Sequence, residues 1–330
     1  MMSQPRTIDE NGAIRRINDA KRIVVTTHAR ADGDAIGSAM AMQRVLRQLG
    51  KQAHAYLHEP LAERYAFLCD DDSLTIWKTD EAAAVLKGAD LLIIVDTCAR
   101  AQLGEIADAI SVMSGHRLAI DHHITRDDIV SEVYVDEKAA ACAQIVTSMC
   151  GRAGWKIDPV CATLLFVGLA TDTGWFRFSN TDAQTLKTAA RLIEAGVQPN
   201  ELYEKLFLCE TLPRARLIGE VMSSFELLAD GRLAVIKLTR EALARCGATH
   251  QMTEDLINEP QKLGSVMACV QLVEPPDDGP IRVSLRSKRD IDVAAIAKQF
   301  GGGGHARAAG ARIAGKLPEV TKLVTSAILS

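Results

Sequence analysis

The apolar run at residues 91–95, Leu-Leu-Ile-Ile-Val, restricts the fold of this chain more than any other feature. It contains no polar residue and ends at Asp96, a pattern typical of a strand that is buried on both faces of a parallel sheet. Three further runs are predicted as strands: 22–27 (RIVVTT), 52–57 (QAHAYL) and 116–121 (HRLAID). Helical patterns alternate with these runs, for example at 35–50, where Gly50 ends the helix. The alternation predicts an α/β fold with a parallel sheet.

The sequence changes in character in its C-terminal part. Residues 225–239 predict a hairpin that turns at Asp230-Gly231. Residues 267–288 predict two strands joined by a loop rich in Pro, Asp and Gly. A glycine run at 301–304 and a final helical segment follow. These patterns predict a second, smaller α+β domain.

The length of 330 residues is sufficient for about two domains. We expect three parts: a parallel-sheet domain at 1–181, a charged helical connector at 182–217 and the α+β domain at 218–330.

The composition limits the partners of the protein. The formal net charge is −4 and only 4% of the residues are aromatic, which argues against a basic groove or stacked bases for long nucleic acid. The eight cysteines form no C-x-x-C pair, so we expect reduced thiols. No segment approaches the roughly 18 consecutive apolar residues of a membrane span, and the N-terminus has no signal-peptide pattern. The sequence therefore predicts a cytoplasmic protein without membrane contact.

Acidic residues and histidines gather where predicted strands or a helix end. They occur in four segments: His28, Asp32 and Asp34; Asp96; Asp121, His122 and His123; and Asp172. The carboxyl ends of parallel strands meet at one edge of a sheet, where sites form in α/β folds. So many carboxylates without a cation would repel one another. Aspartates with histidines suit Mn²⁺ or Mg²⁺ better than Zn²⁺.

Each of these residues also has an ordinary structural explanation. An aspartate after a strand, such as Asp96, is often the N-cap of the next helix. A single histidine is more often a hydrogen-bonded core or surface residue than a ligand, and we expect this of four others: His54, His58, His116 and His250. The joint pattern of the four segments nevertheless favours a metal centre.

The glycine run of the second domain is a candidate anion site. Its backbone N–H groups can surround a phosphate, and Arg286 offers a guanidinium that matches phosphate oxygens. His305 adds another donor. By itself the run fits a flexible loop, but beside Arg286 and His305 it favours an anion pocket.

The motifs resemble those of the DHH phosphoesterase superfamily. The resemblance covers His28-x-x-x-Asp32-x-Asp34, the VDT at Asp96, the triplet Asp121-His122-His123 and the TDTG around Asp172. Ser284-Leu-Arg286-Ser and the segment from Gly302 to His305 resemble the DHHA1 substrate domain of these enzymes. The chain is most similar to oligoribonucleases of the nanoRNase and pAp-phosphatase type.

The resemblance implies a role for each residue. His28 and Asp32 would hold one metal ion, Asp34 would hold a second, and Asp96 would bridge both. His122 and Asp172 would complete the second site. Two residues would serve catalysis: Asp121 by orienting a histidine, and His123 by contacting the scissile phosphate or its leaving oxygen. Six residues would bind substrate: Ser284, Arg286, Gly302, Gly303, Gly304 and His305.

The expected activity is that of a phosphoesterase with two divalent ions, Mn²⁺ or alternatively Mg²⁺. It would hydrolyse short RNA oligonucleotides of two to about five residues, pGpG-type dinucleotides included, to mononucleotides, and pAp to AMP. The alternatives are a linear or cyclic-dinucleotide phosphodiesterase, a pyrophosphatase-like hydrolase, a RecJ-like exonuclease and a non-catalytic nucleotide sensor. The sequence leaves the preferred substrate and the oligomeric state open, with a homodimer among the options.

Overall fold

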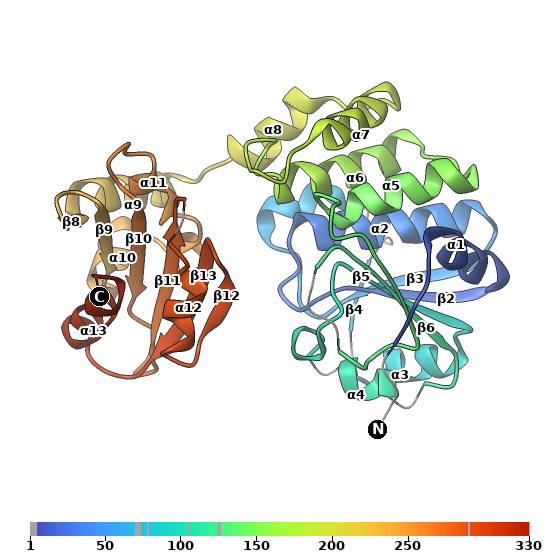
Figure 1. Ribbon diagram of the computed structural model, residues 1–330, viewed down its shortest axis with the longest axis horizontal. Helices are drawn as coiled ribbons and strands as arrows, with labels where there is room; N and C mark the ends of the chain where they lie inside the picture. Colours follow the sequence, from blue (N-terminus) through green and yellow to red (C-terminus); the bar gives the residue numbers. More distant parts are fainter. Residues whose placement is uncertain are drawn as a thin grey trace. The chain divides into compact units, whose positions relative to one another are not determined.

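The four strands predicted in the N-terminal half form the centre of one parallel sheet (Figure 1). The computed structural model describes residues 5–69, 74–77, 79–104, 106–111, 113–123, 127–289 and 291–329. The four strands are β2 (Arg22–Thr26), β3 (Gln52–Leu57), β5 (Leu91–Val95) and β6 (His116–Asp121). Three shorter strands complete the sheet: β1 (Arg6–Thr7), β4 (Thr75–Ile76) and β7 (Glu132–Val135). The order is β1-β7-β6-β5-β2-β3-β4 and all pairs are parallel, so the predicted α/β fold is confirmed.

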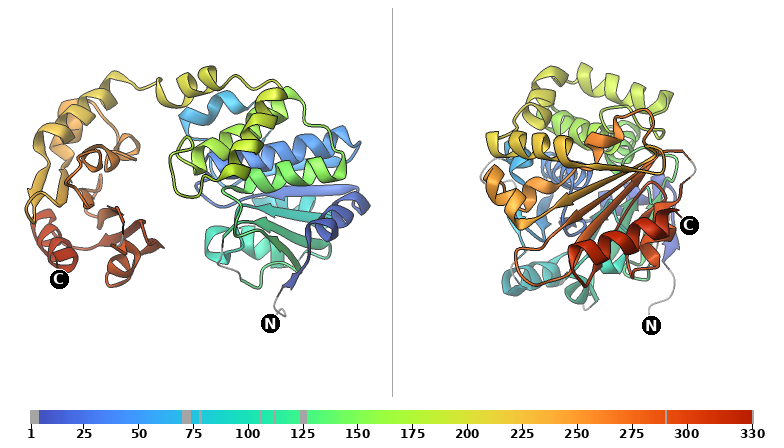
Figure 2. Two further views of the ribbon diagram at one scale, coloured as in Figure 1. Left: turned by 45° about the horizontal axis from the view of Figure 1, so that its top comes forward. Right: turned by 90° about the vertical axis from the view of Figure 1, so that its left-hand side faces the viewer.

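Helices cover both faces of this sheet, as an entirely apolar central strand requires. One face carries α2 (Gly33–Gln48), α5 (Cys142–Ala153) and α6 (Pro159–Asp172), and the other carries α3 (Thr79–Gly88) and α4 (Ile106–Ser111) (Figures 1 and 2). Successive side chains of β5 alternate between the two layers. Ile93 packs with the first group, whereas Ile94 packs with the second.

Three elements before α5 remain: a helix and a 3-10 turn whose buried side chains join the core on the α2 side of the sheet, and a second 3-10 turn. They are α1 (Glu10–Asp19) and two 3-10 turns, η1 (Glu63–Leu68) and η2 (Arg100–Gln102). Among the described residues no helix has the length and apolar character needed to cross a membrane.

Helices α2 and α6 approach each other closely because glycines lie at their contact. A Cβ atom on Gly37 would lie 2.3 Å from the carbonyl oxygen of Leu164. A Cβ atom on Gly168 would lie 2.8 Å from Oδ1 of Asp34. No larger residue fits either position without a shift of the backbone or of Asp34. The close contact brings the end of α6 to the beginning of α2.

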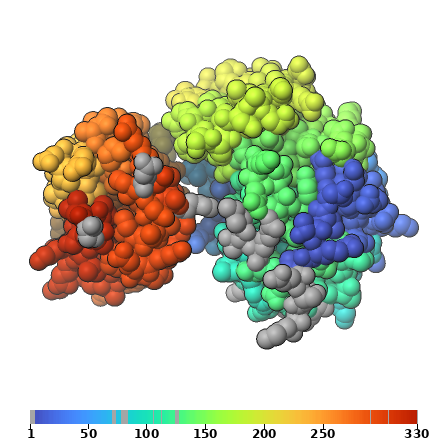
Figure 3. Space-filling model, in the orientation of Figure 1, coloured from blue at the N-terminus to red at the C-terminus, as the bar shows by residue number. Residues whose placement is uncertain are grey.

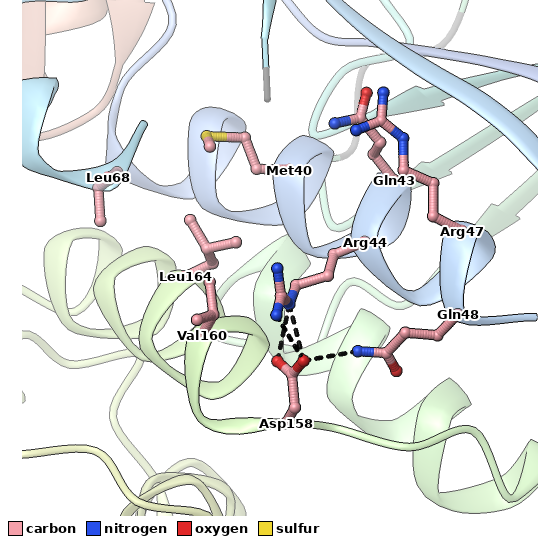
Figure 4. A pocket seen from close by; sticks show the side chains of 9 residues that line it. All are labelled: Met40, Gln43, Arg44, Arg47, Gln48, Leu68, Asp158, Val160 and Leu164. Carbon is pink, nitrogen blue, oxygen red and sulfur yellow. Dashed lines mark hydrogen bonds and ion pairs between the residues drawn. The ribbon is translucent and has the colours of Figure 1, made fainter. Parts of the chain in front are cut away.

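A polar contact fixes the other end of the same helix pair (Figure 4). Asp158 is the N-cap of α6 and accepts a hydrogen bond of 2.9 Å from the backbone N–H of Cys161. Its carboxylate also accepts hydrogen bonds from two side chains of α2. Nε of Arg44 lies 2.8 Å from both carboxylate oxygens, and Nε2 of Gln48 lies 2.7 Å from one of them. The α2–α6 pair is therefore anchored at both of its ends.

Residues 182–217 are helical, as expected. They contain α7 (Ala183–Glu194), α8 (Pro199–Phe207) and the beginning of α9 (Leu212–Ser224). The chain divides into two compact units, 1–209 and 210–330, so α7 and α8 belong to the first. In Figure 3 the yellow-green side chains of this segment form an outer surface of the first unit. The predicted limits at 181 and 217 remain a prediction.

The second unit contains a six-stranded mixed sheet in the order β12-β13-β11-β10-β9-β8. The predicted hairpin is formed by β8 (Glu226–Leu228) and β9 (Leu233–Leu238), and the predicted strand pair is β10 (Ala268–Val273) and β11 (Ile281–Ser287). The sheet ends with β12 (Gly303–His305) and β13 (Ala308–Ile313).

Helices also cover both faces of the second sheet. The helices α12 (Val293–Lys298) and α13 (Leu317–Leu329) pack on one face. The other face carries α9, α10 (Arg240–Cys246), the 3-10 turn η3 (Gln251–Thr253) and α11 (Asn258–Gln261). The predicted smaller α+β domain is confirmed.

Candidate metal centre

The topology of the first sheet brings the six predicted metal ligands together. The chain order reverses beside β2, which lies between β3 and β5. Such a reversal opens a crevice at the carboxyl ends of the strands. Residues from three strand ends and one helix end meet there: His28, Asp32 and Asp34 after β2, Asp96 after β5, His122 after β6 and Asp172 at the end of α6.

The candidate ligand atoms form two clusters of three residues, and a third group, Asp96, Asp121, His122 and His123, overlaps both of them. In the first cluster (His28, Asp32 and Asp96), Nε2 of His28 lies 3.4 Å from Oδ2 of Asp96 and 4.0 Å from Oδ1 of Asp32. In the second cluster (Asp34, His122 and Asp172), Nε2 of His122 lies 3.9 Å from Oδ2 of Asp34 and 3.6 Å from Oδ2 of Asp172.

Asp96 lies between the two clusters. While Oδ2 faces His28, Oδ1 lies 3.3 Å from Nε2 of His122. The side chain is only 3% exposed, and the backbone has φ +62°, which is uncommon for a residue other than glycine. Backbone strain of this kind concentrates at functional sites. Because its two oxygens face different clusters, Asp96 is placed where it could contact two ions at once.

Two buried polar atoms of this centre fit a cation. Oδ1 of Asp96 and Nε2 of His122 are buried without a hydrogen-bond partner among the described residues. Buried polar atoms are rarely left unpaired in folded proteins. Both histidine rings point Nε2 toward the carboxylates because Nδ1 donates to a backbone carbonyl, Ala29 in the case of His28 and Ala139 in the case of His122. Such a bond on the other ring nitrogen is usual for histidines that hold a metal.

The electrostatics of the centre also favour a cation. Burial raises the pKa of Asp34, and the charges of Asp96 and Asp172 raise it further. Burial likewise raises the pKa of Asp172 to about 6. Burial lowers the pKa of His122, but Asp96 and Asp34 outweigh this effect and raise it to about 10. The carboxylates thus favour a positive charge at this place, and a divalent cation could supply it.

Asp34 is held by neighbours that sequence reasoning did not identify. It is 1% exposed and accepts hydrogen bonds from Oγ of Ser38 and from the backbone N–H groups of Cys142 and Ala143. The last two lie at the beginning of α5, where the helix dipole favours a negative charge. Ser38 could have been found, since it follows Asp34 by four residues on the same helix face. The backbone donors leave no signal in the sequence.

Asp121 and His123 form a hydrogen-bonded pair beside the clusters. Asp121 is fully buried, and its Oδ1 accepts from Nδ1 of His123 at 2.8 Å. The same oxygen accepts from the backbone N–H groups of His122 and His123. The hydrogen bond to Asp121 raises the pKa of His123. Asp121 thus fixes the orientation of the His123 ring, and its role in catalysis stays a prediction.

The other aspartates and histidines have structural surroundings. Asp32 is both a helix cap and a candidate ligand: it accepts from the N–H groups of Asp34 and Ala35 at the beginning of α2, and it also faces His28. His58 donates to the carbonyl of Thr27 and His250 to that of Glu274. His54 and His116 are exposed.

The candidate substrate residues of the second unit lie on or next to two strands, β11 and β12, which flank β13 in the sheet. Ser284 and Arg286 are on β11, where Ser284 is opposite Gly310 of β13, and Gly310 is in turn opposite Gly303 of β12. Arg286 is half-buried, and its Nη1 donates to the carbonyl of Leu285.

The glycine run is part of this sheet rather than a free loop. Gly304 has φ +138°, and a Cβ atom there would lie 2.5 Å from the carbonyl oxygen of Ala308. A Cβ atom on Gly302 would lie 2.1 Å from the carbonyl oxygen of Gly310. The close approach of β12 and β13 therefore requires these glycines. The side chain of His305 lies outside the described ones.

The comparison with known proteins agrees with both units. The profile of the DHH family, N-terminal domain, matches residues 22–169, and that of the DHHA1 domain matches residues 239–330. The chain belongs to the DHH family of phosphoesterases, hydrolases of phosphoester bonds, and carries a DHHA1 domain.

Particular relatives place it more closely. The chain is 30% identical over 296 residues to the bifunctional oligoribonuclease and PAP phosphatase NrnA of Thermus thermophilus, which covers 89% of this chain and 84% of the relative. The crystal structure of an exopolyphosphatase-related protein from Bacteroides fragilis has a TM-score of 0.92 at 23% identity, covering 97% and 95% of the two chains. RecJ of Thermus thermophilus in complex with Mn²⁺ has a TM-score of 0.50 at 12% identity, covering 97% of this chain and 54% of RecJ.

Proposed function

We propose that the protein is a two-ion phosphoesterase that hydrolyses short oligoribonucleotides and pAp. The observation that carries the proposal is the position of Asp96, which turns one oxygen toward His28 and the other toward His122. A pair of divalent ions can activate a water and neutralise the charge that develops in an in-line displacement at phosphorus.

Each residue of the centre has a proposed role. His28 and Asp32 would hold the first ion, Asp34, His122 and Asp172 would hold the second, and Asp96 would contribute to holding both. Oxygen-rich ligation with histidine suits Mn²⁺ and also permits Mg²⁺. The structural relative RecJ has been crystallised with Mn²⁺.

His123 has a separate role in proton transfer. Its Nδ1 is engaged with Asp121, so the ring can deliver a proton only from Nε2. We propose that this proton goes to the leaving oxygen as the bond to phosphorus breaks. Asp121 fixes the ring and stabilises its charged form.

The second unit is proposed to bind the part of the nucleotide that does not react. Arg286 would pair with a phosphate, and Ser284, the N–H groups of Gly302, Gly303 and Gly304, and His305 would add donors. A substrate of two to about five nucleotides is consistent with the net charge of −4 and with the oligoribonuclease and PAP phosphatase activities named for the Thermus relative.

A substrate survey tests the proposal. Purified protein with Mn²⁺ is assayed on pAp, a pGpG-type dinucleotide, a five-nucleotide RNA, a 20-nucleotide strand, a cyclic dinucleotide and pyrophosphate, each with a chelator control. We expect turnover of the first three, and none with chelator. A higher rate on the 20-nucleotide strand, the cyclic dinucleotide or pyrophosphate would replace the proposed substrate class. Tight binding of dinucleotide without turnover would identify a sensor.

A further inference from the structure

The segment 139–143 contacts two of the three ligands of the second cluster through its backbone. The carbonyl of Ala139 accepts from Nδ1 of His122 at 3.2 Å. The N–H groups of Cys142 and Ala143 donate to the carboxylate of Asp34 at 2.6 and 2.9 Å. A shift of this short segment would therefore move both His122 and Asp34.

Asn180 joins the same segment to the third ligand. Its Nδ2 donates to the carbonyl of Ala140 at 3.0 Å and to the carbonyl of Asp172 at 3.2 Å. One amide group thus connects the end of α6, which carries Asp172, with the backbone that holds His122 and Asp34. The bond also satisfies one of the carbonyls that the end of a helix leaves without an internal partner.

We infer that Asn180 is a positioning residue for the second cluster: it fixes Asp172 relative to Asp34 and His122 and so sets the affinity for one of the two proposed ions. The inference rests on the proposed two-ion function. Asn180 touches neither ion nor substrate in this assignment and acts through the two carbonyls.

The chain before Asn180 is built to hold it in place. Gly174, Trp175 and Phe176 have φ values of +55°, +58° and +63°, a left-handed turn that two large side chains rarely adopt. The backbone N–H of Trp175 donates to the carbonyl of Ala170 at 2.6 Å. The indole ring packs edge to face against Phe166 of α6. Such a turn persists only where its surroundings fix it.

The chain around Ala140 is fixed in a similar way. Oε1 of Gln144 accepts from the backbone N–H of Ala140 at 3.1 Å and from Oγ1 of Thr185 at 3.3 Å. Thr185 forms the capping box of α7 together with Asp182, the N-cap residue. Asp182 follows Asn180 by two residues. Asn180 and Ala140 are therefore each supported by neighbouring contacts, and the Asn180 amide links Ala140 to the end of α6.

The first cluster has supports of its own. The backbone N–H of Ala29, next to His28, donates to the carbonyl of Gln102 at 2.7 Å. Oγ1 of Thr27 donates to the carbonyl of Val95, next to Asp96, at 2.9 Å. Removal of the Asn180 amide should therefore weaken the binding of the ion at the second cluster and leave the binding of the ion at the first cluster nearly unchanged.

The test is a Mn²⁺ titration of the Asn180→Ala variant of the whole chain in the absence of substrate. Binding is measured by calorimetry or by the electron paramagnetic resonance signal of free Mn²⁺. Loss of a hydrogen-bond partner of a ligating side chain typically costs about 10- to 100-fold in affinity, and the lower value applies here because Asn180 is exposed and bonds backbone carbonyls. We expect that loss at one of two sites, with kcat on pAp recovering in excess Mn²⁺. Ser179→Ala, at the neighbouring exposed position, is the matched control and should titrate like the wild type.

The outcomes separate the inference from the function on which it rests. If the wild type binds fewer than two ions, the proposed two-ion function fails. If the wild type binds two and Asn180→Ala binds both with unchanged affinity, the positioning role is wrong. Two other results would also overturn the positioning role, because each indicates a general loss of structure. One is an equal loss of affinity for both ions, and the other is a large fall in the melting temperature of the metal-free variant.

Discussion

At the scale of single residues, the candidate centre consists of side chains that the sequence makes visible and backbone groups that it does not. Asp96 and His122 could be identified because each follows a predicted strand, where polar residues are conspicuous after an apolar run. Ala139 and Ala143 could not, since an alanine carries no sign that its N–H or C=O holds a ligand. Asn180 lies six residues after the TDTG motif, and only the fold shows which carbonyls it reaches.

Asp96→Asn tests the residue that lies between the two clusters. The change removes the charge available to two ions, so we expect kcat on a dinucleotide to fall by about a thousandfold, the upper range for loss of one charge partner of the transition state. Asp90→Asn is the control: this half-buried carboxylate lies just before β5, accepts from the backbone N–H groups of Lys21 and Arg22 away from the clusters, and should retain activity when changed. Near-wild-type turnover of Asp96→Asn in Mn²⁺ would disprove the assignment.

At the scale of elements, the strands that are buried on both faces were predictable, whereas the short edge strands were not. The run at 91–95 has a single reasonable interpretation because every residue is apolar. β1 and β4 have two residues each, and β7 has four, too few for a periodic pattern. Their pairing depends on tertiary contacts, such as those of Glu132 described next.

Glu132 connects three elements at the edge of the sheet. It lies on β7 and accepts from Arg16 of α1 at 2.7 Å and from Arg6 of β1. The hydrogen bond from Arg16 lowers the pKa of Glu132 from 4.5 to about 2, although burial opposes the shift. A carboxyl group whose pKa is lowered in the folded state stabilises the protein above its unfolded pKa, and the effect disappears as the pH falls toward the folded value.

Glu132→Gln should therefore destabilise the protein in a pH-dependent way. We expect the free energy of unfolding to fall by about 1–2 kcal/mol at pH 7, a modest value because Arg6 is largely exposed and water screens its charge. The difference from wild type should shrink as the pH is lowered below about 4.5. Urea unfolding at pH 7, 5 and 3.5 measures this, and a difference that stays constant over the series would contradict the ion-pair explanation.

The close contact of α2 and α6 gives a second prediction for the elements. Gly37→Ala places a Cβ atom 2.3 Å from a backbone oxygen of α6, so the helices must separate. Overpacking of this kind costs about 1–3 kcal/mol. Gly151→Ala is the matched control, since it lies in α5 with no atom within 4 Å of the added Cβ. Alanine there should leave stability unchanged or raise it by up to about 1 kcal/mol. Equal effects of the two changes in urea unfolding would refute the packing argument.

At the scale of the whole molecule, the proposed metal ligands all lie in the first unit and the proposed substrate residues all lie in the second. The order of the two units was predictable because their patterns differ, one alternating strands with helices and the other rich in hairpins. The exact limits were not, since α7 and α8 are charged, helical segments that could belong to either side.

Arg286→Ala tests this division of roles. Loss of a hydrogen bond to a charged group costs about 1.5–3 kcal/mol, which corresponds to a KM about 10- to 100-fold higher on a dinucleotide. Mn²⁺ affinity should not change. Arg245→Ala removes an exposed guanidinium of α10 in the same unit and serves as the control. The division fails if Arg286→Ala loses Mn²⁺ while KM stays the same.

The spread of the clusters along the chain has a thermodynamic consequence. The ion at His28, Asp32 and Asp96 and the ion at Asp34, His122 and Asp172 would each tie together segments of the first unit that are distant in sequence. By mass action, an ion at a hundred times its Kd adds about 2.7 kcal/mol to the stability of the state that binds it. Residues 210–330 contain none of these ligands and would gain nothing. Heating with increasing Mn²⁺ should therefore separate one melting transition into two, because only the transition of residues 1–209 moves upward.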